Sequence, residues 1–140
     1  MNRLLTPPAL MLAIGVALLS NTSKATEHPI DYSKVTNAEL RGAGNLLVRY
    51  VLTADNPCLT IQYLKPGHPG VFLRERTICS LGETRFDRDF ALVEFKTLDF
   101  HDDRLDVEME FTPSRRGHKA IRRCSIALQP DSIGDLICNR

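Results

Sequence analysis

The sequence predicts an all-β fold, a small antiparallel β sandwich or barrel with at most one short N-terminal helix and two disulfides. Short apolar stretches with a period of two are separated by turns rich in Gly, Pro and Asp, which is typical of antiparallel strands. The four cysteines are also spaced around two of those turns. An α+β arrangement, with one helix packed on a curled antiparallel sheet, is the alternative.

The sequence of the first stretch of the domain, residues 36–53, is compatible with either a helix or a strand. Residues 36–39 (Thr-Asn-Ala-Glu) match a capping box, which favours a short helix that begins at Asn37. Two glycines soon afterwards would weaken this helix, and residues 46–52 then predict a strand. One helix over residues 37–53, with its apolar residues along one stripe, is the alternative. Periodicity does not decide between the two.

The next stretches alternate clearly between apolar and polar side chains. Residues 59–63 alternate Leu, Ile and Tyr with Thr and Gln, and therefore predict a strand. A turn rich in Pro and Gly at residues 66–70 then reverses the chain into a further apolar stretch. Residues 105–111 alternate strictly between apolar and acidic side chains, which is the clearest strand signal in the sequence.

The second half of the chain completes the expected sheet. Residues 90–100 predict one strand or a pair of strands, and their apolar side chains change face near residues 96–97, which indicates a β-bulge there. Residues 101–104 (His-Asp-Asp-Arg) supply the following reversal, and residues 113–117 form another loop. Two further short apolar stretches follow before the end of the sequence.

The cysteines predict two disulfides. An even number of cysteines in an exported chain favours disulfides over free thiols. The turn at residues 66–70 lies midway between Cys58 and Cys79, and a second turn lies midway between Cys124 and Cys138. Folding each stretch back as a hairpin places its two cysteines opposite each other, so we expect the pairs Cys58–Cys79 and Cys124–Cys138. A zinc site is disfavoured because the sequence has no Cys-x-x-Cys pair.

Residues 1–25 predict a cleaved signal peptide. A basic residue near the start is followed by an apolar run over residues 9–19, and Ser23 and Ala25 are the small residues that precede the cleavage site. The run is too short to span a bilayer. Residues 26–140 would form a single disulfide-braced globular domain that is secreted or periplasmic, with no transmembrane segment. Cleavage also removes two basic residues from a chain of formal charge +1, so the total charge does not favour nucleic acid.

No motif of a known chemistry is present in the sequence. It contains no Gly-x-Ser-x-Gly elbow, no His-Glu-x-x-His zinc helix and no glycine-rich phosphate loop. We therefore assign no catalytic residue, no metal site and no cofactor, and expect a protein that is not an enzyme. The charged clusters are the remaining features of interest.

A dense basic cluster follows the alternating strand of residues 105–111. Guanidinium groups bind carboxylates and phosphates through paired hydrogen bonds, so this cluster is a candidate surface for an anionic partner. The competing interpretation is that its members pair with the acidic side chains of the preceding strand. The cluster comprises Arg115, Arg116, His118, Lys119, Arg122 and Arg123.

Two further loops carry candidate binding residues. His101, Asp102 and Asp103 lie among other acidic residues, and this arrangement is compatible with calcium binding or acid–base chemistry. The simpler interpretation, which we favour, is that they form the turn before a strand with a solvated acidic face. His68 lies between Gly and Pro residues that would project it from a rigid loop tip.

These observations favour an exported, non-enzymatic binding protein that uses loops 66–70, 101–104 and 113–119. The specific hypothesis is an inhibitor or immunity-type protein that acts on a secreted toxin or lytic enzyme in the bacterial envelope. One alternative is an envelope assembly or adhesion component that binds an anionic glycan through the basic loop. A second is a small secreted hydrolase that uses the region of His101. The expected partner is thus a protein or an anionic envelope polymer, and not a nucleic acid.

Overall fold

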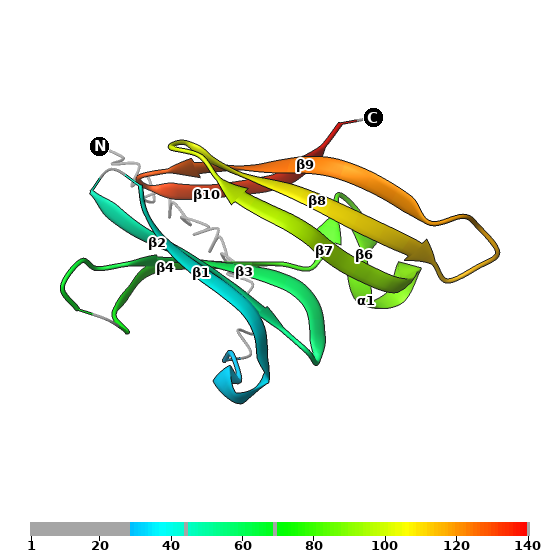
Figure 1. Ribbon diagram of the computed structural model, residues 1–140, viewed down its shortest axis with the longest axis horizontal. Coiled ribbons are helices and arrows are strands. Elements are labelled where there is room, and N and C mark those ends of the chain that lie inside the picture. The colour runs from blue at the N-terminus through cyan, green and yellow to red at the C-terminus, as the bar shows by residue number, and fades with distance from the viewer. Residues whose placement is uncertain (1–28, 44, 69, 140) are drawn as a thin grey trace, which may run out of the picture.

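The computed structural model describes residues 29–139, except residues 44 and 69, as two antiparallel sheets packed face to face (Figure 1). The expected signal peptide, residues 1–25, lies outside the described residues. The elements are η1 (Tyr32–Lys34), β1 (Val35–Ala43), β2 (Leu46–Thr53), β3 (Asn56–Leu64), β4 (Phe72–Ile78), β5 (Ser80–Leu81), β6 (Thr84–Arg85), α1 (Phe86–Asp89), β7 (Phe90–Phe100), β8 (Arg104–Pro113), β9 (Ala120–Gln129) and β10 (Ser132–Cys138).

Each large sheet is a meander. The first has the strand order β1-β2-β3-β4 and the second has the order β10-β9-β8-β7, with every neighbouring pair antiparallel. The small β5–β6 ribbon and the single turn of α1 carry the chain from the first sheet to the second. The all-β antiparallel prediction is therefore confirmed. Among the described residues, no helix has the length and apolar character needed to cross a membrane.

The helix expected from Asn37 is wrong, and so is the alternative helix over residues 37–53. Residues 35–43 form β1, which pairs with β2 in a register that ends at Ala43 opposite Leu46. Because only two residues separate this last pair, the chain closes a hairpin where a helix would have to continue. The helical turn that does precede β1 is η1, whose first residues are capped by the side chain of Asp31.

The hydrophobic core lies between the two sheets. Leu59 and Ile61 of β3 face Leu105, Met109 and other residues of the second sheet, and all four of these side chains are fully buried. The strict alternation of residues 105–111 is confirmed, because the apolar members are buried and the acidic members face outward. The bulge expected near residues 96–97 is also confirmed by a register shift between Phe95 and Thr97.

Arginine side chains of the first sheet bridge the two sheets at both edges of the sandwich. On one side, Arg41 of β1 donates from Nη1 to the backbone oxygen of Phe100 over 2.7 Å. On the other side, Arg76 of β4 donates to the backbone oxygen of Ile133 and forms an ion pair with Asp135 of β10. Charged donors therefore satisfy backbone acceptors of the facing sheet at both margins of the core.

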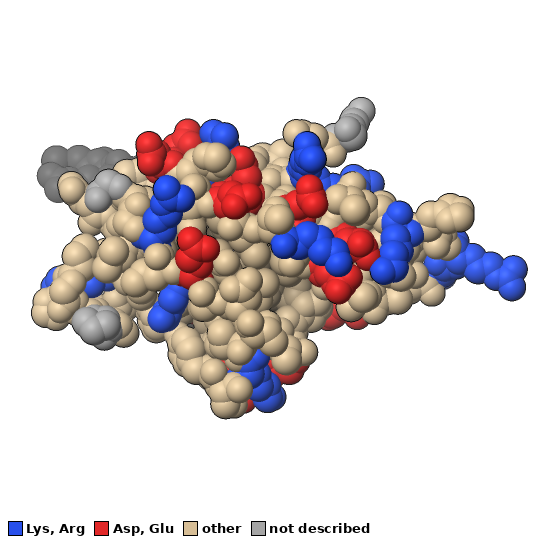
Figure 2. All heavy atoms as spheres, in the orientation of Figure 1, with Lys and Arg blue, Asp and Glu red and all other residues tan. Residues whose placement is uncertain are grey.

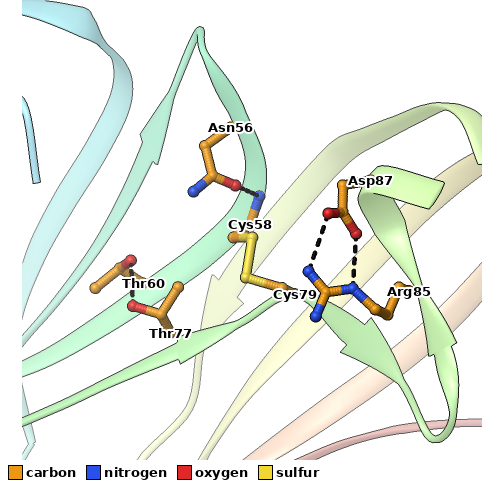
Figure 3. The surroundings of a disulfide bond; sticks show 7 residues. All are labelled: Asn56, Cys58, Thr60, Thr77, Cys79, Arg85 and Asp87. Atoms are coloured by element: carbon orange, nitrogen blue, oxygen red, sulfur yellow. Dashed lines mark hydrogen bonds and ion pairs between the residues drawn. A yellow bond between two sulfur atoms is a disulfide. The ribbon is translucent and has the colours of Figure 1, made fainter. Parts of the chain in front are cut away.

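Both predicted disulfides are confirmed. Cys58 joins Cys79 with the Cα atoms 4.5 Å apart, and Cys124 joins Cys138 with the Cα atoms 3.8 Å apart. Figure 3 shows the first bond linking β3 to the segment that follows β4. Beside it, the side chain of Asn56 accepts a hydrogen bond of 2.9 Å from the backbone N–H of Cys58.

Candidate partner-binding hairpin

The hairpin formed by β8 and β9 extends beyond its sheet. β10 pairs with β9 only as far as Cys124, which lies opposite Cys138. Residues 113–123, which we call the projecting hairpin, therefore continue past the end of β10, and they form the far right end of the molecule in Figure 1. The basic cluster predicted from the sequence lies on this segment.

The base and the tip of the projecting hairpin are both constrained. The Cys124–Cys138 disulfide joins β9 to β10 at the point where the hairpin begins to project. Directly beyond it, the backbone N–H of Asn139 donates to the oxygen of Arg123 over 3.0 Å. In the loop, a Cβ atom on Gly117 would lie 3.0 Å from Cγ of Pro113, so the chain packs closely against itself at this point and a larger residue would require the Pro113 ring to shift.

Two of the basic residues pair with the acidic strand. Lys119 Nζ lies 2.6 Å from a carboxylate oxygen of Glu110, and Arg123 Nε lies 3.3 Å from one of Glu108. The hydrogen bond from Lys119 lowers the pKa of the Glu110 carboxyl group below its ordinary value. For Lys119 and Arg123, the interpretation that the cluster neutralises its neighbouring strand is therefore confirmed.

The other arginines of the cluster remain without a counter-charge. Arg115, Arg116 and Arg122 form no ion pair with any residue that the structure describes, and they are exposed together with His118. Residues 113–123 include no Asp or Glu. Figure 2 shows the resulting arrangement, with Lys and Arg side chains at the projecting end and acidic side chains farther back along the sheet.

An exposed apolar side chain lies next to Arg122 in β9. Ile121 of β9 is 61% exposed, and it lines a shallow hollow of about 790 Å³ together with Arg122 and Arg123. Among the residues that the structure describes, no strand neighbours β9 on this side before Cys124, and this leaves the hollow open. The hairpin thus offers apolar contact and positive charge on adjacent residues.

The turn at residues 101–104 lies at the opposite end of β8. A strand of this length separates its two ends by about 30 Å. His101, Asp102 and Asp103 are all exposed, and His101 Nε2 lies 3.0 Å from a carboxylate oxygen of Asp106. These residues form the turn that the simpler interpretation expected, and the structure does not bring them together with the projecting hairpin.

His68 lies in a third loop, separate from the other two. Its backbone N–H donates to the oxygen of Lys65 over 3.1 Å, and its own oxygen accepts from the N–H of Val71 over 3.1 Å. The loop joins β3 to β4 in the first sheet and lies at the end of the molecule opposite to the projecting hairpin (Figure 1). The three predicted loops therefore do not form one continuous binding surface.

The part of the chain that the structure describes contains no group of three or more His, Cys, Asp or Glu side chains placed to hold a metal ion. The His101–Asp106 pair is itself exposed on both sides, with 45% and 40% of the side chains accessible. Asp106 also pairs with Arg104 over 3.0 Å, so these side chains form an exposed charged cluster at the turn. This pair gives the hydrolase hypothesis no support.

Sequence reasoning missed a polar cluster on the outer side of the first sheet. Gln62, which the alternation places on a solvated face, is fully buried. Its side-chain oxygen accepts two hydrogen bonds from Arg49, and the Arg49 guanidinium lies 5.5 and 5.8 Å from the ring centres of Tyr32 and Phe72. The only sequence signal for this arrangement is that the strand of residues 59–63 lies in the middle of a run of strands.

Comparisons with family models, with curated proteins and with solved structures found no match to this chain. The function is therefore argued from the geometry of the projecting hairpin.

Proposed function

We propose that this chain is an exported, non-enzymatic binding protein that uses the projecting hairpin, residues 113–123, to engage an acidic surface of a secreted protein. The observation that carries the proposal is that Arg115, Arg116 and Arg122 are exposed and form no ion pair with any described residue. Elsewhere on the same sheet, Lys96 and Arg104 pair with neighbouring acids. Within this sheet, the unneutralised positive charge is thus concentrated on the projecting hairpin.

The chemistry of the hairpin suits carboxylate groups. Each guanidinium can donate two parallel hydrogen bonds to one carboxylate, which a lysine ammonium group cannot do in the same geometry. Ile121 supplies exposed apolar area beside Arg122, and binding interfaces combine such apolar contacts with arginine anchors. The disulfide at the base reduces the entropy that the hairpin would lose on binding.

The specific form we propose is an inhibitor or immunity-type protein for a lytic enzyme or toxin of the envelope. Most glycoside hydrolases carry a pair of catalytic carboxylates in a cleft that admits a polymer. A narrow hairpin with unpaired arginines complements such a cleft in both shape and charge, and opposite charges across an interface also accelerate association. A rigid binding element of this kind blocks access without any catalytic residue of its own.

Affinity capture with a charge-reversed variant tests the proposal. The purified protein, with its disulfides intact, is immobilised beside the triple variant Arg115→Glu, Arg116→Glu, Arg122→Glu, and both are exposed to an envelope extract at low salt. We expect the unmodified protein to retain a lytic enzyme or toxin and to reduce its activity at stoichiometric amounts. The triple variant should lose this retention, and raising the salt should weaken binding because exposed charges are screened.

The matched control replaces three exposed cations elsewhere, Lys65, Arg74 and Arg88, by Glu. It therefore changes the total charge by the same amount. This control should retain the partner as well as the unmodified protein does. Equal loss in both triple variants would contradict the role of the hairpin, since it would show an effect of total charge alone. Retention that survives protease digestion of the extract would instead favour the anionic glycan alternative.

A further inference from the structure

β1 is an edge strand that the rest of the described chain leaves uncovered. It ends the order of the first sheet, so one side of its backbone has no neighbouring strand among residues 29–139 as the structure describes them. Every residue from Thr36 to Gly42 is exposed, on both faces of the strand, and Leu40 is 52% exposed. A long, regular and exposed edge of this kind is a template for pairing with another strand, and proteins usually protect such edges.

The backbone of Leu40 faces the free edge. Ala43 and Leu46 pair across a separation of only two residues, and residues that flank such a turn exchange both backbone hydrogen bonds. Hydrogen-bonded and non-hydrogen-bonded residues alternate along an antiparallel strand, so Arg41 and Glu39 bond to β2 as Ala43 does. The N–H and C=O groups of Leu40, which lies between Glu39 and Arg41, are then directed to the other side of the strand. The groups of Leu40 point outward.

The sequence of β1 complements itself about Leu40. If two copies pair antiparallel with Leu40 opposite Leu40, Glu39 of each copy lies opposite Arg41 of the other copy. Ala38 then lies opposite Gly42, so no bulky side chain opposes another at this pair. The outward backbone groups of Leu40 exchange hydrogen bonds with their counterparts, and the side chains of the two Leu40 residues share one face.

The two charged residues are available for these contacts. Neither Glu39 nor Arg41 forms an ion pair with a residue that the structure describes. Glu39 accepts only a long hydrogen bond of 3.4 Å from the hydroxyl group of Tyr50. Arg41 uses Nη1 for the backbone oxygen of Phe100 and has further N–H groups to donate.

We propose that β1 pairs with β1 of a second copy of this chain and so forms a two-fold symmetric dimer with a sheet continuous across both copies. The self-complementary placement of Glu39 and Arg41 selects a second copy as the occupant of this edge, because every contact made in one direction is repeated in the other. The inference is independent of the partner proposed for the projecting hairpin.

Charge reversal tests the dimer directly. Analytical ultracentrifugation of the purified protein should show a concentration-dependent dimer. Glu39→Arg places arginines opposite one another in the dimer, and Arg41→Glu does the same with glutamates, so each variant alone should dimerise about tenfold more weakly or worse. An equimolar mixture of the two variants restores both opposite-charge pairs, and we expect it to form heterodimers at the concentrations at which the unmodified protein dimerises.

A second pair of variants leaves unchanged the hydrogen bonds that Glu39 and Arg41 form within one copy. Leu40→Lys sets two like charges against each other at the two-fold axis, and it should abolish the dimer while leaving the thermal unfolding of the monomer unchanged. Leu73→Lys, on β4, is the matched control because Leu73 is 53% exposed, and it should leave the dimer intact. A monomer at all concentrations, a dimer that survives Leu40→Lys, or a variant mixture that stays monomeric would each overturn the proposal.

Discussion

Individual polar side chains add to the contact between the two sheets. Arg76 leaves β4 and reaches the backbone oxygen of Ile133 and the carboxylate of Asp135 on β10. A hydrogen bond from a charged donor contributes about 1.5–3 kcal/mol when it is buried. The Arg76 side chain is 40% exposed, so solvent screening should place its contribution toward the lower end of that range.

Arg76→Met should therefore lower the free energy of unfolding by about 1–2 kcal/mol, because it removes the bridge while keeping most of the aliphatic stem. Arg74→Met is the control, since Arg74 lies on the same strand and its guanidinium makes no hydrogen bond with a described residue. Urea denaturation followed by circular dichroism measures both. Equal losses in the two variants would show that the bridge across the sheets contributes nothing.

Tyr63 should make stability depend on alkaline pH. Its side chain is buried, and its hydroxyl group donates to the backbone oxygen of Ser132 over 3.0 Å. Burial raises the pKa of Tyr63 above its ordinary value of about 10. Because the folded protein holds this proton more tightly than the unfolded chain, the contribution is fully present below pH 10 and is lost as the pH rises through the raised pKa.

Tyr63→Phe should accordingly reduce stability by about 1 kcal/mol at neutral pH, through loss of the hydrogen bond. The variant should also lose stability less steeply than the unmodified protein when the pH is raised above about 10. Part of the slope will remain, since burial raises the pKa of Tyr50 as well. Denaturation midpoints measured across that pH range give the two slopes, and parallel slopes would contradict the assignment to Tyr63.

At the scale of the elements, sequence prediction succeeded where one face of a strand is buried. The period of two over residues 105–111 follows from β8 having one face in the core. β1 carries no such pattern because neither of its faces is buried. The local capping motif then favoured a helix, although pairing with β2 determines the conformation. The alternation correctly predicted β3 as a strand, but β3 is buried on both faces, so the burial of Gln62 did not follow from that pattern.

The sequence predicted the candidate site only in part. The clustering of basic residues is visible in the sequence, but the β8–β9 register decides which of them are neutralised. That register places Arg123 opposite Glu108 and Met109 opposite Arg122. Arg123 thus meets an acid, whereas Arg122 lies across from an apolar residue. The projection of the hairpin depends on where β10 ends, and no local pattern specifies that.

The disulfide at the base should control the order of the projecting hairpin. Replacing Cys124 and Cys138 together by Ala should lower the free energy of unfolding by about 3 kcal/mol, as expected for a loop of this size. It should also accelerate amide hydrogen exchange in residues 120–123, since these lie directly beyond the lost cross-link.

The double replacement of Cys58 and Cys79 by Ala is the comparison for this effect. It should lower the free energy of unfolding by a similar amount, because the chain-entropy term changes slowly with loop length. The local exchange of residues 120–123, measured below the transition, should stay unchanged relative to the unmodified protein. Equal acceleration in both double variants would mean that the cross-link at the base does not order the hairpin specifically.

Across the whole molecule, the sheets depend on each other. Each is a meander whose strands pair mainly with their sequence neighbours, so either could form its hydrogen bonds alone. Each alone would nevertheless expose one apolar face, because the core cluster draws on both sheets. Ile61 of the first sheet and Met109 of the second are both fully buried there. Burial of these faces against each other is therefore the main stabilising contribution to the fold.

Met109→Ala should destabilise both sheets equally. Truncating a buried methionine costs about 2–5 kcal/mol, and the loss should appear in the slowest-exchanging amides of β3 as fully as in those of β8, because one core stabilises both sheets. Leu73→Ala, at an exposed position, should change neither set. If the β8 amides were weakened while those of β3 kept their protection, the first sheet would be an independent folding unit, and the bridges from Arg41 and Arg76 would join two separately stable parts.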